Sequence, residues 1–171
     1  MALRTVLTWP DSRLRDIATD VSVVDQSVLS LVEDLFDTMY AESGVGLAST
    51  QIGVPMRVVV VDCSAEQDAP IALINPKIIR GEGTVWWREG CLSLPGVTAE
   101  VERFESVEVE YLDFSGQTVR HQATGLEAVC IQHEIDHLDG QLYIDRLAEL
   151  ERKATLLDYD EARASTDESV L

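Results

Sequence analysis

Two histidines four residues apart, in the segment His133–His137 (HEIDH), can meet at one point only if this segment is helical. Residues with this spacing lie on one face of an α-helix, about 6 Å from each other. Two imidazoles placed in this way can share a metal ion, and Glu134 then projects beside them as a base for an activated water. The alternative is a pair of histidines on a helix surface that bind nothing.

The residues around this motif support a helix. Thr124–Glu127 (TGLE) has the pattern of a capping box, in which the Thr and Glu side chains bind the free amides of a new helix. We therefore expect a helix over Leu126–Leu138 that ends at Asp139–Gly140.

A third metal ligand has to come from another part of the chain. Cys91 follows Gly90 in a segment that ends shortly before Pro95, and a thiolate is a natural ligand. Cys130 is the rival thiol, but it lies seven positions from His137, or ~10.5 Å along a helix. Metal–ligand bonds are only ~2.0–2.3 Å long, so Cys130 and His137 cannot readily meet on one ion. The predicted ligands are Cys91, His133 and His137, with one open position.

Apolar periodicity predicts the remaining elements and an α+β fold. An amphipathic helix is expected over Ser27–Ala41, and the β-branched segment Arg57–Cys63 reads as a strand buried on both faces. Antiparallel or mixed β-sheets then pack around the central HExxH helix, between this N-terminal helix and a C-terminal one. The other expected elements are strands at Ile71–Asn75, Lys77–Arg80, Thr84–Arg88 and Thr98–Arg103, a hairpin of Val107–Leu112 and Gln117–Gln122, a helix over Ala148–Asp158, and a flexible tail over about 160–171.

Composition limits the classes of partner. The 171 residues suit one catalytic domain, 1–171, and carry 13 Lys+Arg against 31 Asp+Glu, a formal charge of −18. Such a surface disfavours nucleic acids and anionic membranes, and no apolar run is long enough to span a bilayer. Three widely spaced cysteines and the absence of a secretory signal favour a reducing compartment, so we expect a cytoplasmic protein.

Three segments together resemble the signature motifs of peptide deformylases. They are Gly44–Gln51 (GVGLASTQ), Glu89–Ser93 (EGCLS) and Gln132–Leu138 (QHEIDHL), in the family's order and separation. The resemblance implies removal of the formyl group from N-formylmethionine of newly made proteins, with one divalent metal ion. Fe²⁺ is the expected native ion, and Zn²⁺, Ni²⁺ or Co²⁺ can replace it.

The resemblance also assigns roles to individual residues. Cys91, His133 and His137 would hold the metal, and Glu134 would be the general acid and base. Gln51 and the backbone N–H of Leu92 would bind the formyl oxygen as charge develops on it. The substrate peptide would lie against a backbone rim and a side-chain pocket formed by Val45, Gly46, Gly90, Leu126, Val129, Cys130 and His133.

Asp136 lies on the helix side away from Glu134, where an acid is either solvated or paired in the interior. Arg103 is the expected partner, since deformylase-like sequences tend to place an arginine there. We expect a bidentate pair that ties the Cys91 segment to the histidine helix.

Some positions depart from the family pattern. Ser49 adds a hydroxyl near the site, and Thr98 stands where many members carry a basic residue. Some bacterial members dock on the ribosome through a basic C-terminal helix, but Leu147–Leu171 holds three Lys+Arg and seven Asp+Glu. The expected protein is a monomer that acts on formyl-Met nascent peptides without that docking helix.

Two other functions use the same residues. An HExxH endopeptidase would need a groove running both ways from the metal, and such zinc enzymes normally take His or Glu as third ligand. A non-catalytic domain stabilised by a closed metal site would need a fourth ligand, for which His121 is the only other histidine.

Overall fold

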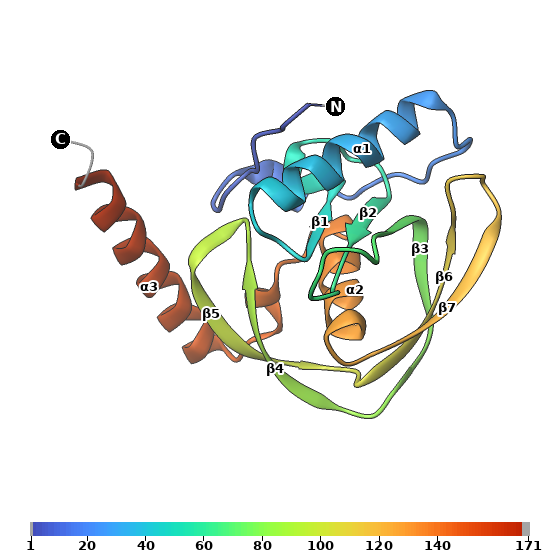
Figure 1. The fold of residues 1–171 in the computed structure, drawn as a ribbon. Helices are drawn as coiled ribbons and strands as arrows, with labels where there is room; N and C mark the ends of the chain where they lie inside the picture. Colours follow the sequence, from blue (N-terminus) through green and yellow to red (C-terminus); the bar gives the residue numbers. More distant parts are fainter. Residues whose placement is uncertain (1, 169–171) are drawn as a thin grey trace.

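The computed structural model describes residues 2–168, in which a helix comes before the strands and two more α-helices follow them (Figure 1). The α-helices are α1 (Gln26–Ala41), α2 (Gly125–Leu138) and α3 (Glu149–Glu168), and the 3-10 helices are η1 (Ser12–Arg15), η2 (Ser49–Ile52) and η3 (Tyr143–Arg146). The strands are β1 (Gly46–Ala48), β2 (Val58–Val61), β3 (Ile71–Glu82), β4 (Val85–Cys91), β5 (Leu94–Arg103), β6 (Ser106–Leu112) and β7 (Thr118–Thr124).

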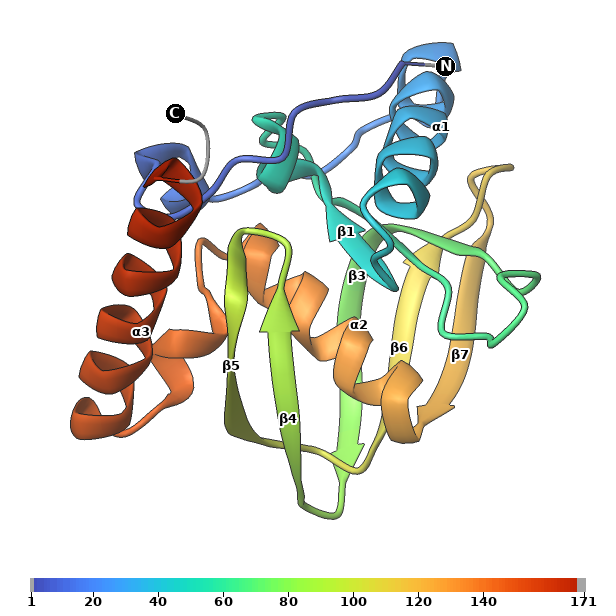
Figure 2. The same ribbon diagram turned by 60° about the vertical axis from the view of Figure 1, so that its left-hand side comes forward.

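The strands form two separate antiparallel sheets. One has five strands in the order β1-β2-β3-β6-β7, and the other is the hairpin of β4 and β5. Figure 2 shows α2 between the five-stranded sheet and this hairpin. The α+β class and the central position of the HExxH helix are therefore confirmed.

Helix α1 covers one part of the five-stranded sheet with an apolar face. Its N-cap, Asp25, accepts hydrogen bonds from the backbone N–H groups of Ser27 and Val28. Below it lies a cluster of buried apolar side chains from α1, β1, β2 and β3, in which Leu35 and Met39 have no exposed surface. The apolar residues whose helical spacing predicted α1 are the residues that pack into this cluster.

Helix α2 is buried far more completely. Every residue from Ala128 to Leu138 is buried, because the sheet lies on one side and the β4–β5 hairpin on the other. The predicted cap at its start is wrong, since the Thr124 side chain makes no capping hydrogen bond. Glu127 instead faces His121 on β7, with the carboxylate oxygen 3.0 Å from Nε2, so a cross-element pair replaces the local one.

Strand β3 runs without a break through Pro76, where two strands were expected. The pairing with β6 shifts register between Ile74 and Lys77, which absorbs the residue that cannot donate to the ladder. Asn75 takes a left-handed conformation with φ of 51°. Its side chain binds both backbone groups of Val21, which holds this bulge in place.

Helix α3 is also longer than expected. It continues to Glu168 rather than stopping near Asp158, so the described part of the expected tail is helical, and residues 169–171 lie outside the described residues. Residues 159–168 contain no Gly or Pro and include two Ala and two Glu, which favour a helix. The Tyr159 hydroxyl donates to the Trp9 carbonyl at 2.8 Å and fixes α3 to the N-terminal arm.

Candidate metal centre

The three predicted metal ligands come together from two elements. Helix α2 supplies His133 and His137, and the last residue of β4 is Cys91. Their ligand atoms all lie within 4.8 Å of one another. The Nε2 atom of His137 is 3.3 Å from the Cys91 sulfur and 3.2 Å from Nε2 of His133, so the three donors face a common point.

This donor set fits a divalent transition metal. One thiolate and two imidazoles are ligands that iron, zinc, nickel and cobalt accept. Burial lowers the pKa of His137 well below its ordinary value, and the neighbouring His133 lowers it further, so its imidazole is neutral as a ligand must be. Within residues 2–168, no group from Cys130 or His121 belongs to this cluster.

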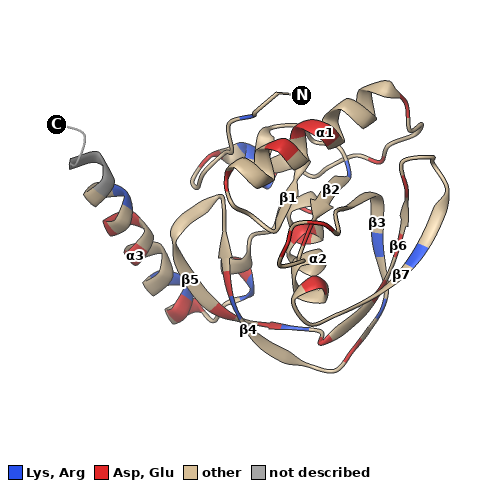
Figure 3. Cartoon of the chain, viewed as in Figure 1, with Lys and Arg blue, Asp and Glu red and all other residues tan. Residues whose placement is uncertain are grey.

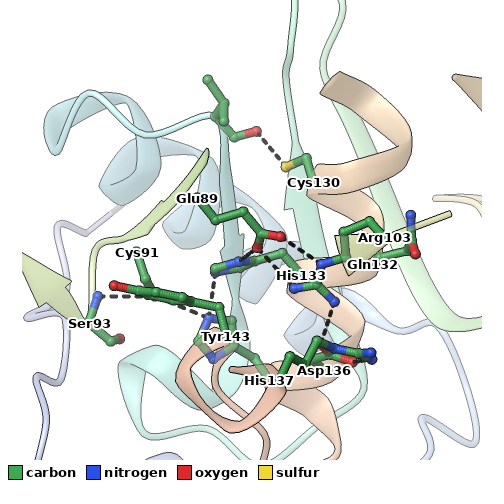
Figure 4. A network of polar contacts seen from close by, with 12 residues as sticks. Glu89, Cys91, Ser93, Arg103, Cys130, Gln132, His133, Asp136, His137 and Tyr143 are labelled. Carbon is green, nitrogen blue, oxygen red and sulfur yellow. Dashed lines mark hydrogen bonds and ion pairs between the residues drawn. The ribbon is translucent and has the colours of Figure 1, made fainter. Parts of the chain in front are cut away.

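Glu89 fixes the orientation of His133. Its Oε1 atom lies 2.7 Å from Nδ1 of His133, and Arg103 binds both oxygens of the same carboxylate, at 2.7 and 2.9 Å (Figure 4). Burial raises the pKa of Glu89, but the hydrogen bonds from Arg103 and His133 outweigh it and hold the pKa at about 2. An ionised Glu89 keeps the proton of His133 on Nδ1 and leaves Nε2 free for a metal.

Sequence reasoning did not assign this role to Glu89, although the residue belongs to the EGCLS segment. The available signal was its position two residues before Cys91 on a strand. Alternation along β4 turns Val85, Trp87 and Glu89 toward α2, and Glu89 is the only one of the three that is buried.

Asp136 contacts Arg103, but not in the expected geometry. Nη1 of Arg103 is 2.6 Å from one oxygen of Asp136, so this contact involves a single nitrogen. The bidentate partner of Asp136 is Arg146 from η3, at 2.6 and 2.8 Å. The Arg103 fork is already occupied by Glu89, which explains the difference. Four charged side chains thus join β4, β5, α2 and η3 behind the histidines.

Glu134 lies beside the predicted ligands with an unusual environment. It is buried, and its Oε2 atom has no hydrogen-bond partner among the described residues. Burial raises its pKa to about 7, which suits a group that exchanges protons near neutral pH. Strand β1 approaches closely here: a Cβ atom at Gly46 would lie 2.6 Å from Oε1 of Glu134 and 2.7 Å from the Cys130 sulfur. Only glycine fits at position 46.

Gln51 points its amide nitrogen toward the same centre. Nε2 is 3.6 Å from the Cys91 sulfur and 3.1 Å from the Ser93 hydroxyl, while Oε1 accepts from the Ala48 backbone N–H at 2.9 Å. The bond to Ala48 fixes which end of the amide faces the cluster. A donor is therefore available next to the thiol.

A cleft with a cavity of about 620 Å³ opens beside these groups. The predicted substrate-binding and catalytic residues in its wall are Val45, Gly46, Gln51, Gly90, Leu92, Leu126, Val129, Cys130, His133 and Glu134. Trp87 and Arg88, which sequence reasoning did not single out, also line it. Arg88 donates to the Thr98 hydroxyl at 3.2 Å, so a basic group from the neighbouring strand stands beside Thr98.

Two other positions differ from the sequence-based picture. The Ser49 hydroxyl donates to the Met56 carbonyl and turns away from the cleft, so it adds no polar group there. Cys63, expected in the core, is only half-buried and packs against the edge of the core cluster beneath α2.

Comparison with known proteins gives a consistent result. The family model described as polypeptide deformylase matches residues 3–153. The chain is 50% identical over 155 residues to a peptide deformylase of Alkalilimnicola ehrlichii, covering 90% of this chain and 86% of the relative. It is 44% identical over 160 residues to that of Aquifex aeolicus, covering 92% and 95%.

Solved structures agree with the sequence comparison. The crystal structure of a peptide deformylase from Legionella pneumophila superposes with a TM-score of 0.92 at 42% identity, covering 97% of this chain and 98% of that one. The Ehrlichia chaffeensis peptide deformylase in complex with actinonin gives 0.89 at 36% identity, covering 96% and 98%.

Proposed function

The chain belongs to the polypeptide deformylase family, and we propose that the cleft beside Cys91, His133 and His137 is where it removes the formyl group from N-formylmethionine of new proteins. The observation that carries this assignment is the convergence of a thiol and two imidazoles beside a buried carboxyl whose Oε2 atom has no hydrogen-bond partner in residues 2–168. A metal-dependent hydrolase of this family is favoured over an HExxH endopeptidase or a non-catalytic metal domain.

The residues around the cleft divide the hydrolysis between them. A divalent ion held by Cys91, His133 and His137 would supply positive charge that polarises a carbonyl and lowers the pKa of water. Glu134 takes a proton from the attacking water and returns it to the amine as the formyl carbon–nitrogen bond breaks. The Gln51 amide and the Leu92 backbone N–H donate to the oxygen that gains negative charge. Formate and a free amino terminus are the products.

The substrate is held by backbone and by apolar side chains. Gly46 of β1, Gly90 of β4 and Val45 just before β1 offer backbone along which an extended peptide can lie. Leu126, Val129 and Cys130 stand on one face of α2 and accept the methionine side chain. A formyl carbon carries only hydrogen, so a confined site at that end excludes acetylated termini by size.

The native metal is proposed to be Fe²⁺. A thiolate with two imidazoles binds several divalent ions, so Zn²⁺, Ni²⁺ and Co²⁺ are expected to bind to the same ligands.

None of the helices in residues 2–168 has the length and apolar composition needed to cross a bilayer.

We propose a cytoplasmic monomer that meets nascent chains without a basic docking helix. Three unpaired cysteines suit a reducing compartment. Acidic residues outnumber basic ones along α3 (Figure 3), and the segment Leu147–Leu171 has seven Asp+Glu and three Lys+Arg. Negative charge on this helix is repelled by ribosomal RNA.

Formate release from a formyl-Met peptide tests this function. The protein, loaded anaerobically with Fe²⁺, is expected to release formate, and a chelator should abolish the release and added metal restore it. An acetyl-Met peptide of the same sequence is the matched control and should remain intact. No formate from the Fe²⁺-loaded protein, or a rate that chelation leaves unchanged, would contradict the assignment.

A further inference from the structure

Trp87 faces the inside of the molecule although its neighbour faces solvent. Side chains alternate along β4, where Glu89 reaches His133 on α2 and Trp86 is 62% exposed on the opposite face. Trp87 is two residues from Glu89 and therefore shares its direction. Its half-buried side chain lines the same cleft as Leu126 and Val129 of α2.

Trp87 lines two cavities. It lines the cleft of about 620 Å³ beside the metal ligands, and it also lines a second cavity of about 520 Å³. No other described residue lines both. The wall of the second cavity is completed by Val85, Glu105, Ser106, Thr124 and Gly125.

The first turn of α2 marks the same division. Leu126 lines the cleft, whereas the residue before it, Gly125, lines the second cavity. A Cβ atom built on Gly125 would meet no atom within 4 Å, so the space beside it is open. Trp87 and the first turn of α2 are therefore the parts of the molecule that border both cavities.

We propose that the Trp87 indole closes the far end of the pocket for the first side chain of the substrate and so sets the longest side chain that the enzyme accepts. This inference rests on the function proposed above. An unbranched side chain of methionine's length ends at the indole, whereas a longer one would have to displace it. Without the indole, the longer chain would continue into the second cavity.

The second cavity is lined by polar groups, so the Trp87 indole would separate regions of different polarity as well as limit the length of the side chain. Glu105, Ser106 and Thr124 offer a carboxylate and two hydroxyls there, whereas the pocket side presents Leu126 and Val129. A large apolar ring between the two keeps the methionine side chain out of contact with polar groups and their water.

The test compares formyl peptides that differ only in the first side chain. Methionine, norleucine of similar length, and 2-aminooctanoic and 2-aminodecanoic acids of greater length form the series, and kcat/KM is measured for each. Wild type should prefer the first two. Trp87→Ala should raise the kcat/KM of the longest substrate relative to methionine by ~10-fold or more, since a fit of one methylene already changes selectivity on that scale.

Three variants act as controls. Trp86→Ala removes an indole from the outer face of the same strand and should leave the preference of wild type unchanged. Trp87→Phe should give an intermediate preference, and it keeps the test valid if the alanine variant folds poorly. Ser106→Phe added to Trp87→Ala refills the second cavity and should cancel the gain for the longest side chain.

The outcomes separate this inference from the proposed function. Wild type that deformylates the methionine and 2-aminodecanoic peptides equally well would overturn the role of Trp87 while supporting the activity. The same conclusion follows if Trp87→Ala and Trp86→Ala behave alike at full metal content. Absence of formate from every peptide with metal-loaded wild type would overturn both.

Discussion

Helices α1 and α2 pack on the same five-stranded sheet by opposite means. α1 turns an apolar face, including Leu35 and Met39, onto β1 and β2 and leaves its other side in water. From Ala128 to Leu138, α2 is buried on every side, and this segment includes Gln132, His133, Glu134, Asp136 and His137. One helix is held chiefly by apolar area, and the other also by directed polar contacts.

This difference in packing shows that a helix carrying metal ligands needs contacts that fix its orientation. Apolar contact is not directional, so side chains under α1 can change shape and keep the helix in place. The polar residues of α2 need partners in fixed directions. Gln132 spans the two backbone groups of Phe104, and Asp136 lies between Arg103 and Arg146. Such contacts set the rotation of α2 and hence the direction of its imidazoles.

Glu134→Gln tests a buried carboxyl of α2 whose Oε2 atom has no hydrogen-bond partner among the described residues. Activity should fall by ~10²-fold or more, because the amide cannot accept the proton of water. Burial raises the pKa of Glu134 to about 7, so in the metal-free protein its ionised form destabilises the fold, and the neutral amide should not lower the unfolding temperature. Formate release, metal content and thermal unfolding are the measurements. Activity within a few-fold of wild type would remove Glu134 from the mechanism.

Cys91→Ser tests whether Cys91, rather than Cys130, is the thiol that binds the metal. A hydroxyl is a poor ligand at pH 7 where a thiolate forms, so metal affinity should fall by ~100-fold or more, beyond the ~10–100-fold typical of residues behind the ligands. Cys130→Ser is the matched control and should retain its metal. Competition with a chromogenic chelator measures both. The reverse order of affinities would mean that the ligand assignment is wrong.

Arg103→Ala and Leu35→Ala compare the two kinds of packing directly. Removing Arg103 leaves the buried carboxylates of Glu89 and Asp136 without their shared cation, which should cost ~3–5 kcal/mol of unfolding free energy. Leu35→Ala creates a cavity under α1 and should cost a similar ~2–5 kcal/mol.

Metal affinity tells the two variants apart. Arg103→Ala should weaken it by ~10–100-fold because His133 loses its fixed orientation, whereas Leu35→Ala should leave it unchanged in the folded protein. Denaturant unfolding and chelator competition give the two quantities. Equal metal affinities would show that the charged network behind His133 serves stability alone.

The contrast between apolar and polar packing also explains which elements and site residues could be predicted from the sequence. The apolar period of α1, the β-branched run of β2 and the alternation of β6 each reflect one interaction with the core, so the pattern predicted the element. The HExxH spacing predicted that two imidazoles meet, because helix geometry alone decides it. Cys91 followed from its neighbours and from the limit that helix length places on Cys130.

What escaped prediction depends on contacts between segments distant in the chain. Glu127 has a local partner available at Thr124 and a distant one at His121, and only the fold decides between them. Arg103 could bind Glu89 or Asp136 with its fork, and the choice depends on strand register. The wall formed by Trp87 likewise requires knowing which face of β4 meets α2.

The smallest expected effect lies at the first residues of the two helices. Asp25 caps α1 with hydrogen bonds from two backbone N–H groups, so Asp25→Ala should cost ~1 kcal/mol of unfolding free energy. Thr124 stands at the same position of α2 but makes no capping bond, so Thr124→Ala should change the free energy by less than ~0.5 kcal/mol. Denaturant unfolding of both variants at one pH measures the difference. Equal losses would mean that Thr124 caps α2 in solution, and that the start of α2 is stabilised locally rather than by its neighbours in the fold.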